Sequence, residues 1–157
     1  KTLLDTLQAS ILEGMSDSLS EVRRMNAALL GKIASCYEGE YWVALVPVIA
    51  NKVQMALSGG NREEQPTTKE HVEGYLYALR LVCEDGPEKL SMHSSRPLDS
   101  LVPLFMNLLH ISEGNNQDNG WLHSLKLSVL LGMNSLLPLA ASNDKRRLNG
   151  SEPAARV

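Results

Sequence analysis

The chain has 157 residues, of which 43% are hydrophobic, 21% charged and 4% aromatic, and its formal net charge is −3. This is the composition of one ordinary globular domain, and frequent leucine with few aromatics predicts an aliphatic, helical core. The mild negative charge gives no basic field for nucleic acid, and no segment reaches the roughly 18 apolar residues of a membrane-spanning helix, so neither partner is expected.

Two helices are expected in the first 36 residues. The first runs from about Leu3 to Met15, because its apolar residues recur at steps of three and four. The second begins after Ser20, a residue type that caps helix N-termini. The apolar side of this second helix carries Val22, Met25, Leu29 and Ile33. Its other side has small residues, which let another backbone come close or leave a shallow groove: Ala27, Ala28, Gly31 and Ser35.

The second pair of helices spans residues 41–85. Its first helix, about Tyr41 to Leu57, contains Pro47 near its first turns, where proline can kink a helix without abolishing it. A polar loop at 58–68 leads to the second helix, about Lys69 to Glu84, which is strongly amphipathic. Its apolar side consists of Val72, Tyr75, Leu76, Leu79, Val82 and Cys83, and its polar side of Glu70, Glu73, Tyr77, Arg80 and Glu84. That polar side is either a solvated face with charge pairing along the helix or an inner surface that faces a ligand.

The third pair follows Gly86-Pro87 and a polar link. Its helices are expected at about Leu98 to Ile111 and about Trp121 to Leu139. The latter has one apolar stripe formed by Leu122, Leu125, Val129, Met133 and Leu136, and further leucines on its far side at 127, 130 and 131. A helix that is apolar nearly all round needs cover on both faces. We therefore expect a fragment of a longer superhelix, whose exposed end helix self-associates where a following repeat is missing.

The segments Leu45-Val46-Pro47 and Leu101-Val102-Pro103 show that the chain repeats itself. A repeated helix pair is typical of an α-solenoid, so the expected fold class is all-α, with about three units of two helices each. The expected units are 3–36, 41–85 with its long internal loop, and 97–141. Residues 142–157 have charge, glycine and proline but no apolar period, and we expect them to form a disordered tail.

Several motifs together resemble a known family. They are Glu21-Val22-Arg23, Leu30 to Ser35, Trp42 with Leu45-Val46-Pro47, Val82-Cys83-Glu84-Asp85, and Arg96-Pro97-Leu98. Over residues 3–139 the chain resembles the N-terminal HEAT repeats of importin-β-family nuclear transport receptors, most nearly those of transportin. The loops at 59–68 and 115–120 are longer than the family pattern, and the tail matches nothing in it.

The resemblance implies that the second helices of the pairs bind the small GTPase Ran in its GTP form. It also implies that protein cargo binds parts of the receptor outside this chain, and that the protein shuttles between cytoplasm and nucleus. The positions that match are the partner-binding candidates, with Arg24 and Ser35 the weaker members: Arg24, Ser35, Glu73, Tyr77, Arg80, Glu84 and Asp85. Acidic groups there would meet a basic patch on the GTPase, while Asp85 has an alternative role at the end of its helix.

No set of residues in the sequence indicates catalysis. His71, His93, His110 and His123 fall in different elements without metal-ligand spacing, and the glycine pairs lack the context of a phosphate-binding loop. The two cysteines, Cys36 and Cys83, are expected to be reduced core residues. We therefore expect no enzyme activity, no metal and no cofactor.

Two alternatives remain open at the level of sequence. A generic HEAT scaffold or tubulin-binding module would use the loops within each pair, which makes Asp17 to Ser20 and Ser58 to Thr68 its sensitive positions. An all-helical enzyme fragment would reveal itself by a bound metal or cofactor.

Overall fold

The computed structural model describes residues 3–36, 42–58, 69–92, 96–111 and 119–149. Within these ranges all regular structure is helical, which confirms the expected all-α class. The helices are α1 (Leu3–Gly14), α2 (Ser20–Cys36), α3 (Leu45–Leu57), α4 (Lys69–Asp85), α5 (Pro87–Met92), α6 (Leu98–His110) and α7 (Asn119–Asn149). None of the described helices is both long enough and apolar enough to cross a membrane.

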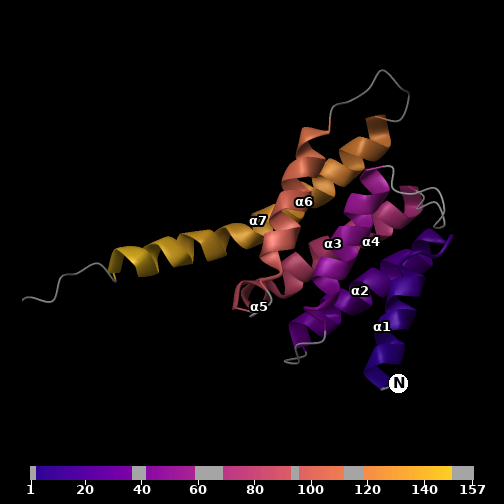
Figure 1. Ribbon diagram of the computed structural model, residues 1–157, viewed down its shortest axis with the longest axis horizontal. Coiled ribbons are helices and arrows are strands. Elements are labelled where there is room, and N and C mark those ends of the chain that lie inside the picture. The colour runs from indigo at the N-terminus through magenta and orange to yellow at the C-terminus, as the bar shows by residue number, and fades with distance from the viewer. Residues whose placement is uncertain (1–2, 37–41, 59–68, 93–95, 112–118, 150–157) are drawn as a thin grey trace, which may run out of the picture.

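Helix α4 is the centre of the arrangement. It packs against α2 on one flank and α7 on the other, and it also contacts α3 and α5. The neighbouring helices pair as α1 with α2, α3 with α4 and α6 with α7, and α3 also contacts α6. The second helices α2, α4 and α7 therefore lie in one row, with α3 and α6 side by side next to it, and the C-terminal half of α7 projects away from the others (Figure 1).

The apolar side of α4 was predicted correctly. All six of its members are buried, and they form the middle of the hydrophobic core. They pack with residues of α3 and α6 such as Val46, Ile49 and Phe105. Burial of this continuous stripe holds the flanking helices against α4, because each buried aliphatic side chain contributes about 1.5–3 kcal/mol of hydrophobic free energy.

Helix α2 packs through its small residues rather than through its apolar stripe. Its buried residues are Arg23, Ala27, Leu30, Gly31 and Ala34. In contrast, Met25 is 72% exposed and Leu29 44% exposed. A Cβ atom added at Gly31 would lie 3.0 Å from the Cβ of Leu81 in α4, so the absent side chain sets how closely the two helices approach. Of the two roles expected for the small residues, close approach of another backbone is the one observed.

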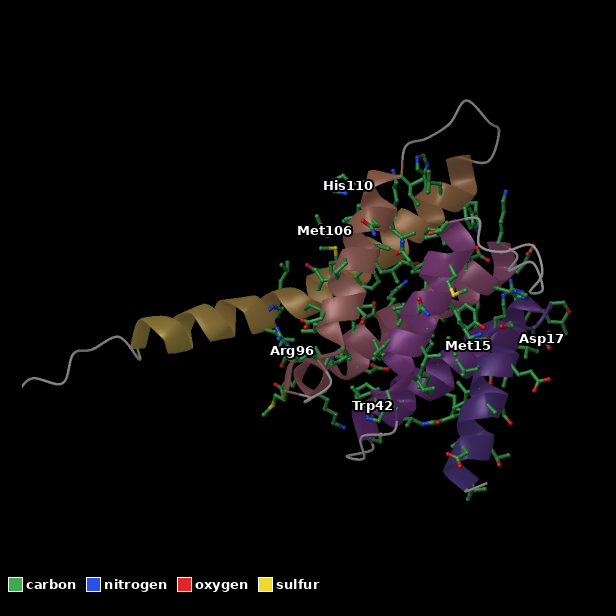
Figure 2. All side chains as sticks on the ribbon, in the orientation of Figure 1. Met15, Asp17, Trp42, Arg96, Met106 and His110 are labelled. Carbon is green, nitrogen blue, oxygen red and sulfur yellow. The ribbon has the colours of Figure 1, made fainter. Side chains whose placement is uncertain are left out.

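Helix α1 contributes less to the core than its apolar pattern indicated. Ile11 and the following Met15 are buried, whereas Leu3 and Leu7 are exposed. Among the described helices α1 packs mainly against α2, so the apolar residues toward its N-terminal end have little cover. Figure 2 labels Met15 and Asp17 in the turn that follows α1.

The two prolines of the repeated segments have different positions in their helices. Pro47 lies in the first turn of α3, which begins at Leu45, so its missing N–H removes no interior hydrogen bond. Pro103 lies inside α6, where the amide it lacks would have bonded the preceding turn. The first helix of the second pair starts later than predicted, at Leu45, and of the two repeated prolines Pro103 is the one that interrupts a helical hydrogen-bond ladder.

The Arg96-Pro97-Leu98 motif lies at the start of α6. Arg96 has a φ of 47°, in the left-handed region that costs a non-glycine residue roughly 1–2 kcal/mol. Its carbonyl accepts a hydrogen bond from the Asp99 amide at 2.9 Å, and its guanidinium pairs with the Asp99 carboxylate at 3.1 Å. Arg96 thus lies two residues before α6, whose exposed side carries Met106 and His110 (Figure 2).

The structure differs from the expected elements at two further places. Residues 87–92 form the short helix α5, where the sequence indicated only the end of a pair and a link. Helix α7 continues to Asn149, so the backbone of the first part of the expected tail 142–157 is helical, while 150–157 lie outside the described residues. On α7, Leu127 and Leu130 are exposed and Leu131 is half-buried, so the surface needed for self-association exists and self-association itself stays a prediction.

The two cysteines differ in their surroundings. Cys83 is buried, as expected, but Cys36 is exposed at the end of α2, so the prediction of a core residue was wrong there. Burial, with a smaller contribution from the neighbouring Glu84 carboxylate, raises the pKa of the Cys83 thiol from its ordinary 9.0 to about 12.

We expect a thiol reagent at mildly alkaline pH to modify Cys36 rapidly in the native protein and Cys83 only after unfolding. Mass spectrometry of the Cys36→Ser and Cys83→Ser variants would assign each rate. Because the unfolded thiol ionises above about pH 9 while the folded thiol keeps its proton, Cys83 also makes the free energy of unfolding fall as the pH rises above that value. Equal labelling rates at the two positions would contradict the buried assignment.

Candidate partner-binding groove

A groove of about 300 Å³ lies where α2, α4 and α7 meet. The polar side of α4 forms its floor, and α2 and α7 form its walls. Its lining residues are Ser20, Arg23 and Arg24 from α2, Glu73, Gly74, Tyr77 and Arg80 from α4, and Ser124, Leu125, Leu127 and Ser128 from α7. The sequence left open whether the polar side of α4 is only a solvated face, and the structure places three of its five residues, Glu73, Tyr77 and Arg80, in a concave surface.

Arg23 anchors one end of the groove. One nitrogen of its guanidinium donates to the carbonyl oxygens of Asp17 and Ser18, at 2.8 and 2.9 Å. The other terminal nitrogen lies 3.6 Å from a carboxylate oxygen of Glu73. The side chain of Arg23 is 7% exposed and that of Glu73 is 46% exposed. Since a buried guanidinium must be hydrogen-bonded, these contacts tie the turn before α2 to α4.

The same turn is held at two further points. The Asp17 carboxylate accepts a hydrogen bond from the Leu19 amide at 2.8 Å, and the hydroxyl oxygens of Ser16 and Tyr75 lie 2.6 Å apart. The turn is therefore fixed to both α2 and α4, and the wall that α2 contributes is positioned by hydrogen bonds as well as by packing.

Tyr77 and Arg80 occupy the middle of the groove. The Arg80 guanidinium lies 5.9 Å from the centre of the Tyr77 ring, within the range of a cation–π interaction. Its Nε donates to a Glu84 carboxylate oxygen at 2.7 Å, one helical turn further along. Helix α7 comes close here, because a Cβ atom added at Gly132 would lie 3.6 Å from the Arg80 Cα. The Arg80 side chain is thus held in place by its own helix.

The structure brings together four of the seven predicted partner-binding residues. Arg24, Glu73, Tyr77 and Arg80 line the groove, and Glu84 reaches it only through its hydrogen bond with Arg80.

Ser35 and Asp85 lie elsewhere, near the C-terminal ends of α2 and α4. The Ser35 hydroxyl donates to the Lys32 carbonyl at 2.9 Å, and the Ser35 carbonyl accepts from Lys89 of α5 at 3.3 Å. A Cβ atom added at Gly31 would lie 2.8 Å from a carboxylate oxygen of Asp85, which places Asp85 against α2. A role at the end of its helix fits Asp85 better than a role in the groove.

Sequence reasoning missed the contribution of α7 and the position of Arg23. Ser124 and Ser128 stand one helical turn apart in a leucine-rich helix, and this spacing is a signal for a polar side that could have been used. In the sequence Arg23 stands out only as part of the Glu21-Val22-Arg23 motif, whereas the structure buries it at one end of the groove.

The charge of the groove differs in sign from that of the chain. Three arginines and one glutamate line it, whereas the whole chain carries a formal net charge of −3. Glu21 lies just outside, at the start of α2. A hydrogen bond from the backbone N–H of Glu21, a second from the Ser20 hydroxyl, and then the charges of Arg24 and Arg23 hold the pKa of its carboxyl below the ordinary value.

A second, more open groove of about 780 Å³ lies between α3 and α6. Its lining includes the exposed apolar residues Val48 and Met55 together with both repeated prolines. Lys52 and Asp99 are the charged residues of its lining, and none of the predicted partner-binding residues lies there. This groove therefore has no cluster of groups that indicates chemistry.

Comparison with models of protein families and with solved structures gave no match for this chain. Among the described residues no group of three or more histidine, cysteine, aspartate or glutamate side chains is placed to hold a metal ion. The functional assignment therefore depends on the groove and on the sequence resemblance.

Proposed function

We propose that the chain is an α-solenoid of three HEAT-type helix pairs. The contacts support this proposal, because α1 with α2, α3 with α4 and α6 with α7 form successive pairs. The second helices α2, α4 and α7 pack in a row, and the first helices α3 and α6 also touch. This is the pattern expected when repeated pairs stack on their neighbours, with α5 as an insertion between the second and third pairs.

We further propose that this solenoid is part of an importin-β-type nuclear transport receptor and binds a Ran-type GTPase in its GTP form through the second helices. The observation that carries the proposal is the convergence of Arg24, Glu73, Tyr77 and Arg80 in one groove. These residues come from two helices, and they were selected from the positions that match the family because they point away from the apolar stripes of their helices. Tyrosine and arginine are the residue types that contribute most at protein interfaces, and a position within a groove is typical of such anchors. The proposed role involves no catalysis and no cofactor.

Within this proposal, cargo binds parts of the receptor other than this chain, and the receptor moves between cytoplasm and nucleus. The resemblance supports both statements. Partner binding by the second helices is the part that experiments on this chain can address directly.

We expect immobilised Ran loaded with a non-hydrolysable GTP analogue to retain this chain, and Ran loaded with GDP to retain much less. The Tyr77→Ala variant should weaken retention by about tenfold or more, since truncation of an interface anchor costs about 2 kcal/mol. Met92→Ala is the matched control, because Met92 is 82% exposed on α5 and lies outside the groove. Binding of wild type and Tyr77→Ala with equal affinity would remove the groove from the Ran interface.

A generic HEAT scaffold remains the alternative, and it predicts a different sensitive position. Leu19 is 60% exposed on the turn between α1 and α2, while residues 59–68 lie outside the described part of the chain. If Leu19→Ser abolished capture of a partner and Tyr77→Ala did not, the scaffold interpretation would replace the transport role.

A further inference from the structure

The positive groups of the groove are not equally available to a partner. Arg23 is occupied by two backbone carbonyls and by Glu73. Arg80 uses its Nε for Glu84, and its side chain remains partly exposed. Arg24 is exposed, and the described residues give it no ion pair within 4 Å. The carboxylate of the groove, Glu73, is directed at Arg23. Beyond the Arg23–Glu73 pair, the charged residues of the lining are therefore Arg24 and Arg80, while Glu21 lies beside Arg24 just outside the groove and Glu84 pairs with Arg80.

The neutral groups around these cations suit a peptide. Tyr77 and the exposed Leu127 offer apolar surface, and Ser20, Ser124 and Ser128 place hydroxyl groups along the walls. The volume of about 300 Å³ is at the lower end of the range for small-ligand sites, so the groove accommodates the side chains of a short segment rather than a folded domain. Arginine binds carboxylates through two parallel N–H groups, which gives such contacts both strength and direction.

We propose that the groove between α2, α4 and α7 binds an extended acidic segment of a partner protein. Carboxylates of the segment pair with Arg24 and with the free edge of Arg80, and an apolar side chain of the segment packs on Tyr77 and Leu127. This inference deepens the proposed function, and it rests on the groove being the partner surface. It reverses the expectation that acidic groups of this chain meet a basic partner.

The test measures fluorescence anisotropy of the labelled peptide Glu-Glu-Leu-Glu-Glu at low ionic strength, where screening is weak. The intact chain should bind this peptide at least tenfold more tightly than the same peptide with lysine in place of glutamate. Arg24→Glu should weaken binding of the acidic peptide by about tenfold or more, because it replaces attraction by repulsion at the rim. Lys52→Glu is the matched control, since it makes the same change of charge at an exposed site on α3, outside the groove, and it should leave binding within about twofold.

Three results would overturn the inference: no binding of the acidic peptide by the folded wild type, equal weakening by Arg24→Glu and Lys52→Glu, or equally tight binding of a short oligothymidylate. Circular dichroism of each variant confirms that it is folded. Retention of the wild-type chain on Ran loaded with the GTP analogue separates this inference from the transport proposal. Ran binding without peptide binding would overturn only the proposal that the groove binds an acidic segment. Peptide binding without Ran binding would overturn only the proposed transport role.

Discussion

Replacement of Gly74 by alanine is expected to lower the free energy of unfolding by about 1–3 kcal/mol, the range that overpacking usually costs. A Cβ atom added at this position would overlap the carbonyl oxygen of Met15 and would also lie 3.2 Å from the Arg23 Cδ. The Met15 oxygen belongs to the backbone of a turn that is fixed by hydrogen bonds, so it cannot easily move. The strain should therefore exceed the gain of about 1 kcal/mol that alanine brings inside a helix. Urea denaturation followed by circular dichroism measures the difference.

Gly120→Ala is the control for this prediction. Nothing lies within 4 Å of a Cβ atom added at Gly120, which stands in the first turn of α7. This variant should be as stable as wild type or more stable by up to about 1 kcal/mol, because alanine reduces the freedom of the unfolded chain. If Gly74→Ala and Gly120→Ala changed the free energy of unfolding by the same amount, the close approach between α4 and the turn before α2 would not be the cause of the loss in Gly74→Ala.

Arg23→Met is expected to lower the free energy of unfolding by about 3–5 kcal/mol. Two hydrogen bonds from a charged donor contribute about 1.5–3 kcal/mol each, and the ion pair with the half-exposed Glu73 adds less than about 1 kcal/mol. Methionine keeps much of the apolar length of the side chain but leaves the Asp17 and Ser18 carbonyls without their donor. The same denaturation experiment measures this loss.

The neighbouring residue provides the control. Arg24→Met removes an exposed guanidinium with no role in the turn, and stability should change by no more than about 0.5 kcal/mol. Glu73→Gln, made in wild type and in Arg23→Met, gives the coupling between the two side chains. A loss for Arg23→Met no larger than that for Arg24→Met would show that Arg23 does not hold the turn.

Helix α4 shows how far periodicity alone could predict the site. The helical period separated its apolar and polar sides; the apolar side is buried as expected, and part of the polar side, whose surroundings the sequence left open, lines the groove. Three of the predicted partner-binding residues, Glu73, Tyr77 and Arg80, share the polar side because they recur at helical spacing on one helix. Periodicity could not predict that α7 forms a wall of the groove, because no pattern within residues 119–149 indicates that they pack against α4.

Helix α2 shows where the same reasoning fails. Hydrophobicity favours Met25 and Leu29 for the core over Ala27 and Gly31, and the structure buries the smaller residues. The free energy gained by close packing of two helices depends on the distance between their backbones, which small residues reduce. The short helix α5 was missed for another reason, because its six residues are too few for a helical period to be recognised.

The sequence by itself determined the all-α class, the approximate positions of six helices and the two faces of α4, because these depend on residues close together in the chain. Only the tertiary structure decided which face of α2 is buried and what Arg23 binds. It also decided that four predicted partner-binding residues line one groove together with residues of α7, which were not predicted to lie there. The physical reason is that these features depend on distances between segments far apart in the chain. Those distances result from the packing of small residues and from the need of a buried charge for partners.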